Sequence, residues 1–242
     1  MSDVTNNPYE APKADVNAQA VAVGPSGSLE DALAGRYNFE IGDVMREAWS
    51  LTRGMKASFW GAAVVVYAIL IVLALVAASL AGKGRVTQFI PSILLGALGP
   101  VLFIGIIMMG VRRAAGLPVS AATAFSCLDR ALTVFLASLI TTLLMYIGFI
   151  LILIPGIYLA IAYCMTMPLI ADRRLTPWQA IETSRKAVTK RWFTFFGLML
   201  VVGLVIFGSA LALGIGLIWT APWSINVIGV AYRRTFGVAQ TT

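Results

Sequence analysis

Histidine is absent from this 242-residue chain, which also holds only two cysteines and 11 acidic residues. Without imidazole, histidine-based acid–base catalysis and histidine metal ligation are excluded. Cys127 and Cys164 are far apart in the sequence, so we expect neither a disulfide nor a zinc site. We therefore expect a protein that is not an enzyme and that holds no metal and no cofactor.

Charge is scarce as well. Charged residues make up 12% of the chain and hydrophobic residues 59%, and the mean hydropathy is +0.87. A soluble domain carries roughly 25% charge, so the composition predicts an integral membrane protein. No Asp, Glu, Lys, Arg or His lies within the long apolar stretches. Transporters coupled to protons or ions usually place such residues at mid-membrane, so the sequence argues against that class.

The apolar stretches predict an all-α fold with six membrane spans in three hairpins. A helix needs about 20 apolar residues to cross a bilayer. Ala57–Ala81 and Phe89–Val111 each meet that length. Two charge-free runs of about 40 residues, Ala131–Ala171 and Trp192–Tyr232, are each long enough for two helices. We expect their turns at Ile154-Pro155-Gly156 and at Gly214-Ile215-Gly216.

Three arginine pairs recur 61 and 60 residues apart, each closing a hydrophobic stretch. This spacing predicts three copies of one hairpin with every pair on the same side of the bilayer. If that side is cytoplasmic, only Lys83 and Arg85 among the 18 basic residues face out, which the positive-inside rule favours. Both termini would then be cytoplasmic. The pairs are Arg112 and Arg113, Arg173 and Arg174, and Arg233 and Arg234.

A short amphipathic segment precedes each hairpin, and we expect these segments to be cytoplasmic interfacial helices. Each contains an alanine followed by a bulky apolar residue, at Ala48, Ala124 and Ala180. In the third, Thr176, Pro177 and Gln179 form a capping box. The expected apolar faces are Ile41, Val44, Met45, Ala48 and Met55 in the first and Trp178, Ile181 and Val188 in the third.

Small residues in the spans predict close helix approach, within one chain or between copies. The glycines concerned are Gly96, Gly99, Gly105, Gly110, Gly203, Gly208 and Gly214.

The chain divides into a polar tail over 1–40, a transmembrane domain over 41–236 and a short cytoplasmic tail over 237–242. Residues 1–40 are rich in Asn, Ala, Pro, Gly and Ser, which predicts a disordered cytoplasmic tail. Within it Asn7, Pro8, Tyr9 and Pro12 form either a short docking motif for a protein partner or an ordinary stretch of tail.

The arginine pairs are the candidate binding site. With Arg185 and Lys186, Arg112, Arg113, Arg173, Arg174, Arg233 and Arg234 would bind anionic lipid headgroups or an acidic partner, because guanidinium suits phosphate. The alternative is that they only fix topology. The basic residues are juxtamembrane and are not interleaved with exposed aromatics, so nucleic acid is not an expected partner. Self-association stays open.

Several segments resemble known families. The stretch from Ile154 to Ala160, Pro168 to Asp172, and Trp178 to Lys186 resembles bacterial inner-membrane families of unknown function. It is also similar to the membrane region attached to some glycerophosphodiester phosphodiesterases. The resemblance implies a six-span bundle in a bacterial plasma membrane and transfers no catalytic residue, because that enzyme's soluble domain has no counterpart here.

Together these patterns favour a non-enzymatic inner-membrane scaffold or a lipid- or partner-binding protein. The alternative is an uncoupled transporter or channel along a pseudo-threefold axis. A packed apolar centre would favour the scaffold.

Overall fold

The computed structural model describes residues 24–80, 85–151 and 153–239, and these residues are almost wholly helical, without a β-strand. The all-α prediction is therefore confirmed. In chain order the elements are α1 (Leu29–Ala34), α2 (Ile41–Thr52), α3 (Lys56–Leu80), α4 (Arg85–Ala114), η1 (Ala121–Phe125), η2 (Leu128–Arg130), α5 (Ala131–Leu151), α6 (Leu153–Ala162), α7 (Thr166–Arg173), α8 (Pro177–Lys190), α9 (Trp192–Leu211) and α10 (Leu217–Phe236).

Four segments of the described chain are long and apolar enough to cross a membrane. They are Lys56–Val76, Ala121–Ile150, Leu153–Arg173 and Trp192–Leu211. These segments fit a membrane protein, as the composition predicts. Helix α10 is different, because 13 of its 20 residues are buried inside the protein. It forms the centre of the molecule, where it packs on α4 and α2.

The hairpin turns agree with the sequence only in part. Gly214 adopts a left-handed backbone with φ of 75° between α9 and α10, at the expected turn. The expected turn at Ile154-Pro155-Gly156 is displaced, because these residues already belong to α6. The following span is also not continuous, since residues 163–165 separate α6 from α7.

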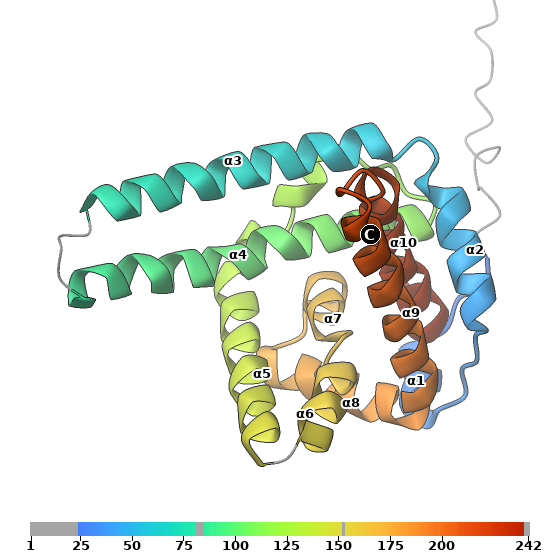
Figure 1. Cartoon of the computed structure of the whole chain (residues 1–242). Coiled ribbons are helices and arrows are strands. Elements are labelled where there is room, and N and C mark those ends of the chain that lie inside the picture. Colours follow the sequence, from blue (N-terminus) through green and yellow to red (C-terminus); the bar gives the residue numbers. More distant parts are fainter. Residues whose placement is uncertain (1–23, 81–84, 152, 240–242) are drawn as a thin grey trace, which may run out of the picture.

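Figure 1 shows that α3 and α4 lie side by side and run across the picture, whereas α5 and α9 run roughly from top to bottom. The start of α3 also meets the start of α10: the indole nitrogen of Trp60 donates to the Ile218 carbonyl at 3.1 Å. The sequence predicts these two ends on opposite sides of the bilayer. The structure therefore does not confirm six spans in three hairpins.

Two glycines set the contact between the central helices. A Cβ on Gly229 would collide with the Gly110 backbone, and a Cβ on Gly110 would collide with the Ile225 carbonyl. Gly105 likewise lies against the Ala124 backbone of η1. The close approach expected at Gly105 and Gly110 is thus present. Gly99, Gly203 and Gly208 have open space instead.

The expected disorder of residues 1–40 is wrong for residues 24–40, while residues 1–23 lie outside the described residues. Ser28 caps α1 by accepting from the Asp31 amide at 3.0 Å. Tyr37 and Phe39 are buried, and both rings pack edge-on against Phe195 of α9. Two aromatic side chains thus secure a segment whose average composition predicts disorder.

The amphipathic repeat forms two regular helices and one irregular element. Helix α2 buries Val44, Ala48 and Thr52. Helix α8 has the predicted capping box of Thr176 and Gln179. The middle copy is only the 3-10 turn η1. In α8, Ile181 and Val188 of the expected apolar face are buried, whereas Trp178 is 62% exposed and does not pack inside the protein.

Candidate functional site

The third arginine pair is built into the protein interior. Arg233 is 2% exposed and donates to the Ala114 carbonyl at 2.6 Å and to a Glu47 carboxylate oxygen at 2.6 Å. Arg234 donates to the other Glu47 oxygen at 2.7 Å. Arg233 also reaches the Pro25 carbonyl at 3.3 Å. One carboxylate thus holds both arginines of this pair.

The second pair is tied to the end of α10. Arg173 donates to the Phe236 carbonyl at 2.5 Å. Its neighbour Asp172 accepts from the Tyr232 hydroxyl at 2.7 Å and from the Ala239 amide at 3.0 Å. These contacts fix residues 237–239, the described part of the expected C-terminal tail, against α7.

The remaining members of the pairs also contact the backbone or an acid. Arg113 donates to the Leu51 and Arg53 carbonyls at 3.2 and 3.0 Å, at the end of α2. Arg112 reaches the Pro118 carbonyl at 3.4 Å. Arg174 lies 3.7 Å from Asp129.

A shared role links Arg113, Arg173 and Arg233. Each donates to carbonyl oxygens at the C-terminal end of a helix other than its own: α2, α10 and α4 respectively. Helix C-termini carry unpaired carbonyls and partial negative charge, so cations are favoured there. Arg113, Arg173 and Arg233 therefore hold helix ends together, and each has its own set of partners.

Arg185 and Lys186 form a different arrangement on α8. Arg185 donates to both Glu182 oxygens at 3.1 and 2.8 Å, and Lys186 lies 3.2 Å from the same carboxylate. The hydrogen bonds from Arg185 lower the pKa of Glu182. Glu182 in turn raises the pKa of Arg185, with a smaller contribution from Tyr158. Two cations thus share one carboxylate and keep a net positive charge.

Tyr158 connects this basic face to an apolar crevice between α6 and α9. Its hydroxyl shares a hydrogen bond of 2.8 Å with the Thr189 hydroxyl. The Trp192 indole donates to the Tyr158 carbonyl at 3.3 Å. The crevice has a volume of about 360 Å³, and its walls are Ile154, Ile157, Tyr158, Trp192 and Phe196.

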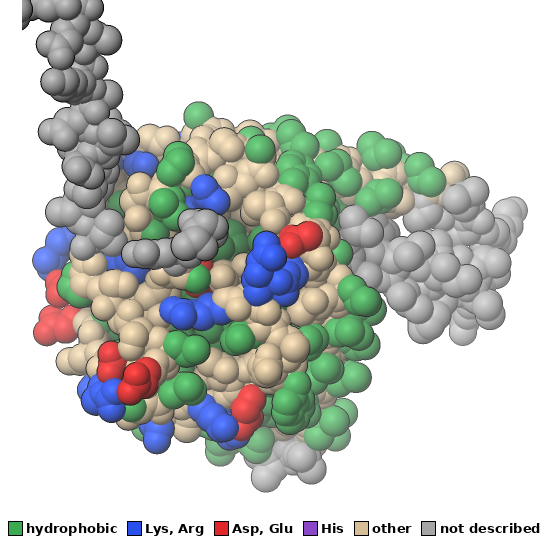
Figure 2. Space-filling model, turned by 180° about the vertical axis from the view of Figure 1, so that it is seen from behind, with side chains coloured by type: hydrophobic (Ala, Val, Ile, Leu, Met, Phe, Trp, Pro, Cys, Tyr) green, Lys and Arg blue, Asp and Glu red, His purple; other side chains and the backbone are tan. Residues whose placement is uncertain are grey.

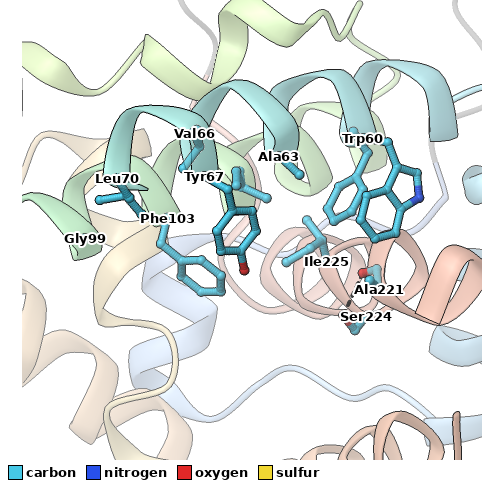
Figure 3. A pocket seen from close by; sticks show the side chains of 12 residues that line it. Trp60, Ala63, Val66, Tyr67, Leu70, Gly99, Phe103, Ala221, Ser224 and Ile225 are labelled. Atoms are coloured by element: carbon cyan, nitrogen blue, oxygen red, sulfur yellow. Dashed lines mark hydrogen bonds between the residues drawn. The ribbon is translucent and has the colours of Figure 1, made fainter. Parts of the chain in front are cut away.

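Two other hollows flank α4. Figure 3 shows the one between α3, α4 and α10, of about 230 Å³, where Trp60, Tyr67 and Phe103 surround an apolar space. The Ser224 hydroxyl there donates to the Ala221 carbonyl at 2.7 Å, so it is already paired. The second hollow lies between α4, α5 and α7 and is about 450 Å³. Neither has a charged side chain in its described lining.

Sequence reasoning selected Arg185 and Lys186 but missed Glu182, Tyr158 and the aromatic wall. A helical signal was available on α8, since Glu182, Arg185, Lys186 and Thr189 recur at intervals of three and four residues. Tyr158 lies on another element, so no local pattern could find it. The docking motif at Asn7, Pro8, Tyr9 and Pro12 lies outside the described residues.

Comparison with known proteins finds no family model, no curated protein and no solved structure that matches this chain. Within the described residues, no three Cys, Asp or Glu side chains are grouped so that they could hold a metal ion. The site must therefore be interpreted from its own chemistry, which combines clustered cations with an adjoining apolar crevice.

Proposed function

We propose that this chain is a non-enzymatic membrane scaffold that binds anionic lipid headgroups, or an acidic protein partner, through its basic side. The separation of charge from apolar surface carries the proposal. In Figure 2 charged side chains gather over the left and middle of the face, and hydrophobic ones along the right-hand edge and on the part of α3 that projects from it. A bilayer suits the apolar surface, and its headgroups suit the charged one.

The topology belongs to the same proposal. Both termini face the cytoplasm, the long apolar helices enter the membrane, and the membrane is a bacterial plasma membrane. The distribution of basic residues supports this orientation. A cysteine replacing Gly84 should react with a membrane-impermeant thiol reagent in intact cells, whereas cysteines replacing Gly116 or Thr189 should be protected. The reverse labelling would contradict the orientation.

An uncoupled transporter or channel is the alternative function. Such a path would need space near the centre of the bundle. The central contact of α4 with α10 instead leaves no room for a Cβ at Gly110 or Gly229, and Ile104 and Val227 beside it are fully buried. This packing favours the scaffold over the channel.

Native mass spectrometry combined with a flux assay would test the proposal. The purified protein should retain an anionic phospholipid or an acidic protein, and proteoliposomes should show no solute flux above that of empty vesicles. A protein that retains neither, or that conducts solutes, would contradict the proposed function.

A further inference from the structure

We propose that the α6–α9 crevice, together with the basic face of α8, binds one anionic phospholipid. The phosphate would contact Arg185, Lys186 and Thr189, and one acyl chain would lie along Trp192 and Phe196. This inference rests on the proposed function and names its ligand class and its site. It also narrows the sequence-based expectation, because it places the headgroup at Arg185 and Lys186 and leaves the arginine pairs out of the site.

The crevice is suited to an acyl chain. Trp192 stacks on Phe196 with centroids 5.0 Å apart and on Tyr158 with centroids 6.3 Å apart, which makes a continuous aromatic wall. The bond from the Trp192 indole to the Tyr158 carbonyl fixes the orientation of that wall. Ile154 is 75% exposed on the opposite helix. The volume of about 360 Å³ lies within the range of roughly 300–1,000 Å³ that ligand sites occupy.

The charge at its edge is suited to a phosphate. Glu182 is the only acid of the described chain that pairs with Arg185 or Lys186, so one positive charge is left over. The exposed Lys190 and Arg191 follow on the same helix end, and Arg191 donates to the neutral Asn38 at 3.2 Å. Arginine can bind phosphate through two parallel hydrogen bonds. Of the paired hydroxyls of Tyr158 and Thr189, the one that accepts their mutual hydrogen bond keeps its own proton and offers one further donor between the charges and the crevice.

The basic face of α8 adjoins the apolar crevice, and this arrangement favours a phospholipid over other anions. A soluble phosphate would satisfy the cations but leave the aromatic wall uncovered. An acidic protein segment would also leave it uncovered unless apolar residues followed the acids. A phospholipid carries a phosphate and acyl chains in one molecule, so it can contact the cations and the adjoining aromatic wall together. Phe193, 82% exposed at the start of α9, gives the same region a further apolar contact with lipid.

The headgroup test uses native mass spectrometry with phosphatidylglycerol and phosphatidylcholine of identical chains. The wild-type protein should prefer phosphatidylglycerol, and R185Q/K186Q should lower its affinity by about tenfold, because each basic side chain near an anionic lipid contributes measurably. The matched control R46Q/R53Q removes two exposed cations, one on α2 and one directly after it, and should change little. E182Q frees both cations and should raise the affinity. Unchanged affinity in both R185Q/K186Q and E182Q would overturn the site.

The acyl-chain test uses phosphatidylglycerol with brominated chains, which quench tryptophan at close range. The brominated lipid should quench part of the tryptophan fluorescence of the wild-type protein, and W192F should not show this quenching. Glycerol phosphate, the headgroup without chains, should not displace the lipid at equal concentration. Displacement by glycerol phosphate, or equal quenching in W192F, would overturn the assignment of the chain to this crevice.

The possible results distinguish a failure of this site from a failure of the proposed function. A wild-type protein with no preference for phosphatidylglycerol would contradict the proposed binding of anionic lipid at any site. A preference that survives R185Q/K186Q and disappears in R112Q/R113Q would contradict only the site. Melting temperatures of all variants, measured alongside, identify any loss that comes from unfolding.

Discussion

Glu47 of α2 and Arg233 of α10 form an ion pair of 2.6 Å between residues 186 positions apart in the chain. Arg233 also donates to the Ala114 carbonyl, so one guanidinium joins the middle of α2 to the C-terminal ends of α4 and α10. The Arg233 side chain is almost fully buried, so it contributes to the packing of the helices and is not an exposed site for an anion.

We expect Arg233→Gln to destabilise the fold strongly. Removing one partner of a buried ion pair typically costs about 3–5 kcal/mol. We expect the lower part of this range, because Glu47 keeps Arg234 as a partner while the Ala114 carbonyl loses its donor. Thermal unfolding in detergent would measure the loss. Arg46→Gln is the control, since Arg46 is 83% exposed and pairs only with Asp43 among the described residues. Equal melting temperatures for the two variants would contradict a structural role for Arg233.

Replacing glycine by alanine should have opposite effects at the α4–α10 contact and at glycines that face open space. Gly229→Ala should destabilise by about 1–3 kcal/mol or more, because its Cβ meets the Gly110 backbone. Gly203→Ala and Gly208→Ala should be neutral or slightly stabilising, since nothing lies within 4 Å and alanine favours helix. The free energy of unfolding in denaturant would distinguish them. A stable Gly229→Ala protein would show that the helices do not cross at this point.

Ser184 of α8 holds the break between α6 and α7. Its hydroxyl donates to the Ala162 carbonyl at 2.7 Å and accepts from the Met165 amide at 3.3 Å. Ser184→Ala would leave both buried groups without this partner, at a cost of about 1–3 kcal/mol. Chemical denaturation should show that loss, and hydrogen exchange should increase at Met165. The neighbouring Thr183→Ala provides the comparison, and an equal response of the two would argue against the bridge.

The packing of residues 24–40 predicts that this segment contributes to folding. Phe39 is buried against Phe195 with ring centroids 5.3 Å apart. Phe39→Ala should cost about 3–5 kcal/mol, as for other buried aromatics. Asn38→Ala changes an exposed neighbour and should leave the melting temperature almost unchanged. If both variants melt like the wild type, the segment is not part of the core.

The sequence alone predicted the features that depend on local pattern. Long apolar runs identified the helical, membrane-compatible class, because hydropathy and helix length are properties of one segment. The capping box of Thr176 and Gln179 marked the start of α8, since a cap involves residues three apart. The glycine at the α9–α10 turn was found for the same reason: its left-handed backbone suits residues without a Cβ.

Tertiary structure decided which of these elements are buried and what the arginines bind. The near-regular spacing of the arginine pairs suggested one shared anion site, yet their partners are carbonyls and acids from distant segments. Residues 24–40 are ordered because Phe195 receives Tyr37 and Phe39. The α6–α9 crevice exists only where Tyr158 meets Thr189 and Trp192. Contacts between residues far apart in sequence depend on how whole helices pack, and no local pattern encodes that packing.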